Sequence, residues 1–114
     1  MKVIIAGGRT FDKYDLLVKY CDKILANQTD IEIVSGTANG ADKLGEKYAI
    51  DRGYSIKPFP ADWSIGKSAG YVRNKQMAQY ADALIVFWDG NSKGTKHMID
   101  LATQYELKIR VIKY

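Results

Sequence analysis

The sequence has few of the residues that build cross-links and metal sites: it contains one cysteine, Cys21, and one histidine, His97. A lone cysteine excludes an internal disulfide and a zinc site built mainly on thiolates. No spacing of His, Cys or paired carboxylates is typical of metal ligands. We therefore expect no metal and no cofactor. We place Cys21 in the core, on the apolar face of a helix, and His97, which has no acidic or nucleophilic partner in sequence, on a helix surface.

Long hydrophobic runs are absent as well. No apolar stretch approaches the roughly 20 residues that a membrane-spanning helix needs. Met1 and Lys2 lead into only four apolar residues before Gly7, which is too short for the apolar region of a signal peptide. We expect a cytoplasmic protein that has no membrane partner.

The excess of positive charge is modest, because 17 Lys and Arg residues stand against 13 Asp and Glu residues, a net charge of +4. This charge permits an anionic small ligand but falls short of the basic stripe that is typical of nucleic-acid binders. We therefore do not expect nucleic acid as a partner. The hydrophobic share of 46% is that of a globular protein. The length of 114 residues predicts a single domain over 1–114.

Five short apolar runs, rich in β-branched residues, stand at regular spacing and predict strands. They cover residues 3–6, 31–34, 54–59, 83–88 and 108–112. The first and fourth runs are nearly continuous, as in strands that are covered on both faces. The third and fifth alternate between apolar and polar residues, which places them nearer an edge of the sheet.

Four segments with helical spacing of apolar residues lie between the strands: 12–27, 39–52, 68–80 and 95–106. The third has the weakest apolar stripe, in which we include Val72 and Met77. Strands that alternate with helices of this length indicate a parallel sheet wrapped by helices. The fold class predicted is α/β, a single three-layer Rossmann-like domain with about five mostly parallel strands and helices on both faces.

The loops that leave the carboxyl ends of the predicted strands are the expected place for chemistry, because ligands of open α/β sheets bind there. These loops cover residues 7–11, 35–42, 60–63 and 89–95, and three of them are rich in Gly and in small polar residues. Small residues let backbone N–H groups approach a ligand, and helix N-termini favour phosphate or carboxylate. The alternative is that the glycines only serve tight turn geometry.

Individual polar residues in these loops each allow two interpretations. Arg9 can make a planar, bidentate contact to phosphate, or it can close a surface salt bridge with Asp12 or Asp42. Asp42 can take part in catalysis, or it can complement the dipole at the start of a helix. The pair Arg73 and Asn74 can lean over the rim or belong to a solvated helix face.

Two tryptophans invite a base-stacking role. Trp63 stands in a loop and is the better stacking candidate, whereas Trp88 ends an apolar strand and fits packing in the core or at the rim. The segment 61–68 ends in Gly-Lys-Ser like a P-loop, but alanine stands where the first glycine belongs. Gly7 and Gly8 do not continue as G-x-G-x-x-G, so no named nucleotide fingerprint is present.

Taken in order, several short motifs resemble the YspA- and YpsA-related branch of the SLOG superfamily. They are Gly7-Gly8-Arg9-x-Phe11, Ser35-Gly36-x-Ala38-x-Gly40-Ala41-Asp42, Pro60-Ala61-Asp62-Trp63, Ala69-Gly70-x-x-Arg73-Asn74 and Gly94-Thr95. The superfamily also contains the lonely guy phosphoribohydrolases and DNA-processing protein A. The resemblance runs from residue 3 to the end of the chain.

The resemblance implies a Rossmann-like domain that binds nucleotides or nucleotide-derived ligands, as a ligand sensor or as a nucleotide-processing enzyme. The lonely guy relatives carry a P-G-G-x-G-T-x-x-E loop whose Glu takes part in catalysis. Gly94 and Thr95 match that loop, but Met98 stands where the Glu belongs. Hydrolysis by that mechanism is therefore in doubt, catalytic residues are unassigned, and whether the protein is an enzyme stays open.

Three functions remain as hypotheses: first, binding of a nucleotide or nucleotide-derived phosphate ligand; second, hydrolysis of an N-glycosidic or phosphate bond; third, binding of single-stranded nucleic acid. A homodimer is a further possibility, supported by exposed Tyr14, Tyr80 or Tyr105 on the helices. The residues expected to surround the ligand are Gly7, Gly8, Arg9, Ser35, Gly36, Gly40, Ala41, Asp42, Asp62, Trp63, Arg73, Asn74, Gly94 and Thr95.

Overall fold

The structure, a computed structural model that describes residues 1–114, alternates strands with helices along the chain. Its elements are β1 (Lys2–Gly7), α1 (Tyr14–Leu25), β2 (Glu32–Ser35), α2 (Ala41–Arg52), β3 (Ser55–Pro58), the single 3₁₀ turn η1 (Trp63–Ile65), α3 (Ala69–Tyr80), β4 (Ala83–Trp88), α4 (Lys93–Gln104) and β5 (Lys108–Lys113). None of the helices has the length and apolar character needed to cross a bilayer.

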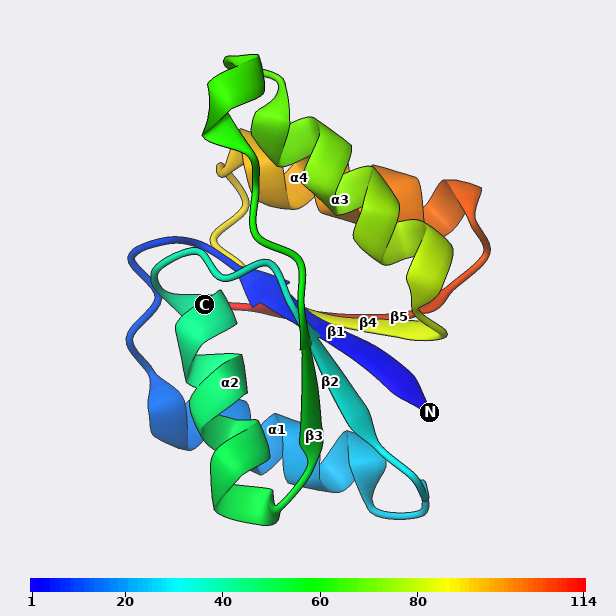
Figure 1. Cartoon of the computed structure of the whole chain (residues 1–114). Helices are drawn as coiled ribbons and strands as arrows, with labels where there is room; N and C mark the ends of the chain where they lie inside the picture. Colours follow the sequence, from blue (N-terminus) through cyan, green and yellow to red (C-terminus); the bar gives the residue numbers. More distant parts are fainter.

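The five strands form one sheet in the order β3-β2-β1-β4-β5, and every neighbouring pair is parallel (Figure 1). The predicted fold class is therefore confirmed. The edge positions of β3 and β5 agree with the alternating patterns of their sequences, and the nearly continuous apolar runs of β1 and β4 lie in the middle of the sheet.

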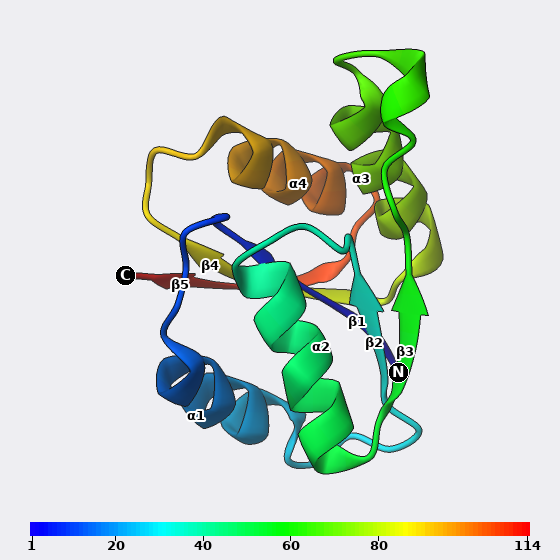
Figure 2. The ribbon, with the colours of Figure 1, turned by 60° about the vertical axis from the view of Figure 1, so that its left-hand side comes forward.

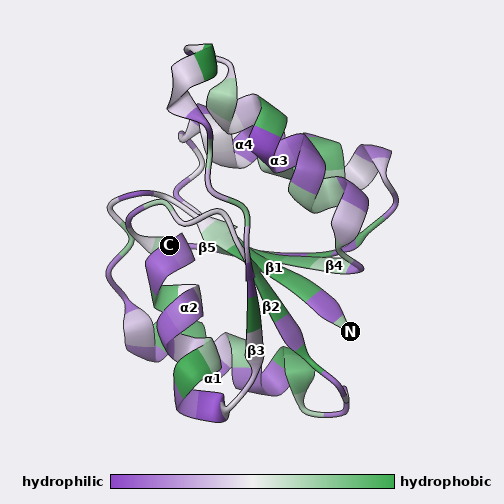
Figure 3. Cartoon of the chain, in the orientation of Figure 1, coloured by the Kyte–Doolittle hydropathy of each residue, from purple (hydrophilic) through white to green (hydrophobic).

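The strands are apolar because both faces of the sheet are covered. Side chains of β1 alternate between the faces: Val3 and Ile5 point into one core, and Ile4 and Ala6 into the other. Helices α1 and α2 cover the first face and α3 and α4 the second (Figures 1 and 2). We call these the α1–α2 face and the α3–α4 face. The hydrophobic colouring of Figure 3 follows the strands between the two layers.

Helix α3 is turned differently from the prediction. Val72, expected on the apolar stripe, is 43% exposed, whereas the polar pair Arg73 and Asn74 is buried together with Met77. The expectation for Val72 was wrong because α3 begins at the rim of the sheet, where it buries polar side chains. The face of the helix that carries Arg73 and Asn74 therefore points inward, and Val72 points toward solvent. The turn η1 before it was not predicted.

The three tyrosines expected on the surface are half-buried and bonded within the chain. Tyr14 donates a hydrogen bond to Asp51, Tyr80 donates one to Glu32, and the hydroxyl of Tyr105 accepts one from Gln79. Each of these bonds joins residues far apart in the sequence, which a sequence pattern does not reveal. The expectation that they are exposed was wrong.

Candidate functional site

A cavity of about 460 Å³ opens at the carboxyl ends of β1 and β4. The loop after β1 leads to α1 on one face of the sheet, and the loop after β4 leads to α4 on the other. The cavity therefore lies at the topological switch point of the sheet, where ligands of doubly wound folds bind. We call it the main cavity. Its volume falls within the roughly 300–1,000 Å³ of small-molecule sites.

Nine of the residues named from the sequence line the main cavity. They are Gly7, Gly8, Arg9, Asp42, Trp63, Arg73, Asn74, Gly94 and Thr95. A second cavity of about 290 Å³, which we call the side cavity, is lined by Gly36 and shares Arg9, Ala38, Trp63 and Arg73 with the main cavity. The remaining four, Ser35, Gly40, Ala41 and Asp62, line neither cavity.

Two of those four residues hold the first two loops together. The N–H of Ala41 donates to the carbonyl of Gly8 at 3.2 Å. Gly40 adopts φ +79°, and a Cβ at this position would lie 2.3 Å from the same carbonyl oxygen. Only glycine suits this backbone and this approach. These residues therefore fix the loop after β2 beneath the loop that carries Arg9.

The other two brace loops from within. The hydroxyl of Ser35 donates to Glu46 at 2.6 Å and accepts from the N–H of Thr37 at 3.0 Å. The carboxylate of Asp62 accepts from the N–H of Ser64 at 3.1 Å and so caps η1. The side chains of Ser35 and Asp62 thus set the shape of the walls.

Arg73 is the most unusual side chain at the site, because it is only 9% exposed and forms no ion pair. Its Nε donates to Asn74 Oδ1 at 3.0 Å, and its Nη1 donates to the carbonyl of Gly36. Its Nη2 donates to no protein atom. Burial lowers the pKa of Arg73, against the opposing charge of Asp42. Asp42 does not pair with Arg73 directly, and a buried cation outside an ion pair is unfavourable unless a further group neutralises it.

Asp42, at the start of α2, is also buried, with 6% exposed. Burial raises its pKa to about 6, although the N–H of Ala38, which donates to Oδ2 at 3.2 Å, and the charges of Arg73 and Arg9 act in the other direction. A Cβ at Gly36 would lie 2.7 Å from Asp42 Oδ2 and 2.9 Å from Arg73 Nη1. The absence of a side chain at Gly36 therefore lets these two charged groups approach one loop together.

Two further cations line the main cavity, and neither is in an ion pair. Arg9 is exposed and makes no salt bridge with Asp12 or Asp42, the alternative that the sequence left open. Its guanidinium carbon lies 5.9 Å from the centre of the Trp63 ring, which is 57% exposed. Lys67 is the third cation. The chain's ion pairs involve other residues: Lys43–Glu46, Lys47–Asp51, Arg52–Asp22 and Lys96–Asp100.

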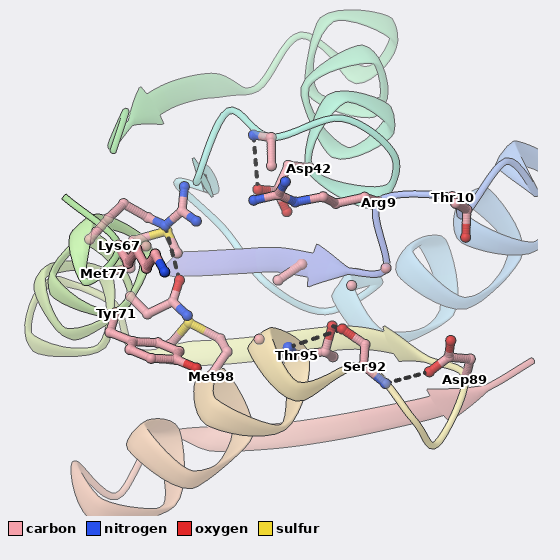
Figure 4. Close-up of a pocket in the computed structure, with 18 of the residues that line it drawn as sticks. Arg9, Thr10, Asp42, Lys67, Tyr71, Met77, Asp89, Ser92, Thr95 and Met98 are labelled. Atoms are coloured by element: carbon pink, nitrogen blue, oxygen red, sulfur yellow. Dashed lines mark hydrogen bonds between the residues drawn. The ribbon is translucent and has the colours of Figure 1, made fainter. Parts of the chain in front are cut away.

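The N-terminus of α4 forms the opposite wall (Figure 4). Ser92 caps the helix by accepting from the N–H and the hydroxyl of Thr95, at 3.4 and 2.9 Å. Asp89 accepts from the N–H groups of Asn91 and Ser92, which lower its pKa. A Cβ at Gly94 would have no atom within 4 Å. Open space therefore reaches the backbone of the first helical turn.

Several lining residues were not named as site residues. Lys67 had a signal in the sequence, because it belongs to the Gly-Lys-Ser stretch. Tyr71, Met77 and Ser92 had no signal except that they lie near residues that were named. Met98, which the resemblance places where a catalytic Glu stands in relatives, lines the cavity with a thioether that cannot transfer a proton. Figure 4 shows Lys67, Tyr71, Met77 and Met98 gathered at one end of the main cavity.

His97 has partners that the sequence did not reveal. Its ring lies 4.3 Å from that of Tyr71, and its Nδ1 lies 3.3 Å from Asn74 Nδ2. Burial lowers its pKa. The expectation of a surface histidine without a partner was wrong, because α3 and α4 pack side by side. No group of three or more His, Cys, Asp or Glu side chains is arranged to hold a metal ion.

Known proteins are similar to the chain in sequence over one part and in fold over nearly all of it. The YAcAr family model, described as "YspA, cpYpsA-related SLOG family", matches residues 1–66. No curated protein matches the chain. A solved structure of DNA processing protein A from Helicobacter pylori, described for its single-stranded DNA binding mode, matches with a TM-score of 0.73 and 20% identity. The match covers 97% of this chain and 64% of that one, so this chain spans under two thirds of that protein.

The solved structure overturns the expectation that nucleic acid is not a partner. A protein with this fold binds single-stranded DNA, so the modest net charge does not exclude such a ligand. Net charge was a poor guide because it averages over the whole surface, whereas Arg9, Lys67 and Arg73 gather at one cavity. The family match covers more than half of the chain, including the loops after β1 and β2. The chain belongs to the YspA, cpYpsA-related SLOG family.

Proposed function

We propose that residues 1–114 form one nucleotide-binding domain, which holds the phosphate of a nucleotide or nucleotide-derived molecule in the main cavity. The observation that carries this proposal is Arg73. Its guanidinium is buried and in no ion pair, and its Nη2, which donates to no protein atom, lies on the side of Gly70 at the cavity wall. A phosphate would pair with this cation directly and would place acceptor oxygens in the plane of the guanidinium.

The rest of the cavity suits the same ligand. Arg9 and Lys67 add two further cations to the lining, and neither is in an ion pair with a protein carboxylate. The open backbone at Gly94 lets the ligand reach the N-terminus of α4, whose partial positive charge favours an anion. The exposed ring of Trp63, beside the guanidinium of Arg9, offers a flat apolar surface for the base.

The test is the affinity of Arg9→Ala for nucleoside monophosphates, measured by calorimetry on whichever of them binds the wild-type chain. We expect binding to weaken by about 1.5–3 kcal/mol, the range for a hydrogen bond to a charged group. Stability should not change, because Arg9 is exposed at the rim. The matched control is Arg110→Ala, which removes the same charge from an exposed position outside both cavities. Unchanged affinity in Arg9→Ala would place the phosphate elsewhere.

Binding of single-stranded nucleic acid is a second candidate, favoured by the fold that the chain shares with DNA processing protein A. The distinguishing measurement is the salt dependence of oligonucleotide binding. Each phosphate contact on a single strand contributes about −0.7 to the slope of log K against log salt concentration. Three contacts, from Arg9, Lys67 and Arg73, should give a slope of about −2. A slope near zero would rule against this candidate.

A further inference from the structure

The side cavity has no role in the site as described so far. It is lined by Gly36, Thr37, Ala38, Asn39, Pro60 and Ala61, together with Arg9, Trp63 and Arg73. Its volume of about 290 Å³ is just below the range for a separate ligand site. Because four residues line both cavities, the side cavity is an extension of the main one.

Arg73 stands at the boundary between the two cavities. Its Nη1 lies on the side of Gly36, which lines the side cavity, and its Nη2 lies on the side of Gly70, which lines the main cavity. Arg9 and Trp63, with the guanidinium carbon 5.9 Å from the ring centre, also line both. Positive charge is therefore concentrated between the cavities.

The wall of the side cavity beyond this boundary carries no charge. It consists of backbone, small side chains and the polar groups of Thr37 and Asn39. Such a wall suits a neutral ring with hydrogen-bonding edges better than a second phosphate. Thr37 is a β-branched residue at φ +64°, a backbone conformation that is strained for this residue type. Residues with such strained conformations are concentrated at ligand-binding sites.

We infer that the ligand is a dinucleotide, with one nucleoside in each cavity and the linking phosphate over the guanidinium groups of Arg73 and Arg9. This inference rests on the proposed function and adds to it the size and the charge pattern of the ligand. Two uncharged rings flank one anionic centre in the ligand, as two cavities flank one cationic boundary in the protein.

The experiment compares probes that share a base and carry one phosphate each: AMP with ApA, TMP with TpT, and GMP with GpG. The dinucleotide should bind the wild-type chain about tenfold more tightly than its monophosphate, because a second base gains stacking and burial. A strand of six nucleotides should bind no more tightly than the dinucleotide. Equal affinity for mono- and dinucleotide overturns the inference, and so does affinity that keeps rising with strand length.

Two variants address the cavities separately. Ala61→Trp fills the side cavity and should reduce dinucleotide affinity to the level of the monophosphate, without changing monophosphate affinity. Gly94→Val fills open space in the main cavity and should weaken both probes. Ile50→Trp adds an indole at an exposed site outside both cavities and is the control. If Ala61→Trp does not fold, Asn39→Trp blocks the same cavity from an exposed position.

The outcomes separate this inference from the function on which it rests. If monophosphates bind, Gly94→Val weakens them and Ala61→Trp lowers both probes equally, the main site stands and the two-cavity ligand is wrong. If no mono- or dinucleotide binds the wild-type chain, the proposed function fails, and the inference fails with it.

Discussion

The body of the α1–α2 face is closed by apolar side chains, whereas the rim of the molecule at the carboxyl ends of the strands buries polar groups, above all on the α3–α4 face. On the first face, Leu17 and Tyr48 are fully buried. On the second, α3 buries Arg73 and Asn74 while Tyr71 stays 51% exposed. A helix that turns polar residues inward departs from the pattern that stabilises folds, and such departures gather at functional sites.

Charges are treated differently in the two regions. Beside the α1–α2 face, Asp22 accepts from Arg52 at 2.7 Å and from the hydroxyl of Tyr48 at 2.7 Å. At the rim, Arg73 and Asp42 are both buried and neither is in an ion pair. The comparison indicates that one region supplies stability, and that the other keeps buried charges out of ion pairs at the expense of stability, as the proposed function requires.

The largest effect on stability should come from the closed face. Leu17→Ala removes a fully buried side chain from α1 and should lower the free energy of unfolding by about 2–5 kcal/mol, through lost burial and the cavity left behind. Urea denaturation measures the change. Nucleotide affinity of the folded variant should equal that of the wild-type chain. A large loss of affinity would show that the two regions are not independent.

At the rim, removal of a buried side chain should raise the free energy of unfolding instead of lowering it. The reason is that the pKa of Asp42 is about 6 in the folded chain, against an ordinary value of 3.8. An acid with a raised folded pKa destabilises the fold progressively as the pH rises between these two values, and the full penalty applies above the folded pKa. Asp42→Asn should therefore be more stable than the wild-type chain at pH 8, by up to about 3 kcal/mol. The difference should vanish near pH 4.

Asp51→Asn is the control for this measurement, because it removes a carboxylate from the same helix. Hydrogen bonds from Tyr14 and Lys47 lower the pKa of Asp51. Its loss should therefore destabilise the chain above the ordinary pKa of an aspartate and leave it unchanged in acid. If both variants shift stability in the same direction at pH 8, the contrast between rim and closed face is not electrostatic.

Arg73→Met should separate binding from stability. Removal of the guanidinium should weaken nucleotide binding at least about tenfold, the effect of losing a charge-assisted hydrogen bond. The free energy of unfolding should fall by about 1 kcal/mol or less, because the buried charge is lost along with its bond to Gly36. Arg52→Met, at the ion pair with Asp22, provides the reference for an arginine remote from both cavities. A nucleotide affinity in Arg73→Met equal to that in Arg52→Met would remove Arg73 from the site.

The smallest effect is a difference between two identical substitutions. The hydroxyl of Tyr48 donates to Asp22, whereas the buried hydroxyl of Tyr114, against Gly8 at the rim, has no hydrogen-bond partner. Tyr48→Phe should lower the free energy of unfolding by about 1 kcal/mol, and Tyr114→Phe should leave it unchanged or raise it slightly. Thermal denaturation of the two variants side by side measures the difference. An equal loss of unfolding free energy in the two variants would mean that the hydroxyl of Tyr114 does form a hydrogen bond in solution.

The sheet could be predicted from the sequence because its signals are local. The runs around Ile4 and Ile85 are apolar on both faces, and the loops that follow the strands contain glycine, so the parallel sheet, its edge strands and the rim where ligands are expected follow from general rules. The inward face of α3 could not be predicted. Its apolar residues are too few to define a stripe, and the contact of Asn74 with His97 depends on packing against α4.

The candidate site shows the same division. Arg9 and Gly94 were named because they lie in segments predicted to connect a strand end to the next helix, and both line the main cavity. Gly40 was named for the same reason, but the structure gives it the task of supporting Gly8. Lys67 and Tyr71 were not named as site residues, because the segment between η1 and α3 and the first turn of α3 have no clear apolar period.

The segment between β3 and α3 is attached to the sheet at an edge strand and projects from the body of the molecule (Figure 1). Residues 60–68 contribute Trp63 and Lys67 to the main cavity, yet none of them belongs to either core. The residues of this wall can therefore be exchanged without disturbing either core, in the way that a hypervariable loop varies on a fixed framework. Evolution or an engineer can alter its length and chemistry to select a different ligand, while Arg73 and the sheet stay as they are.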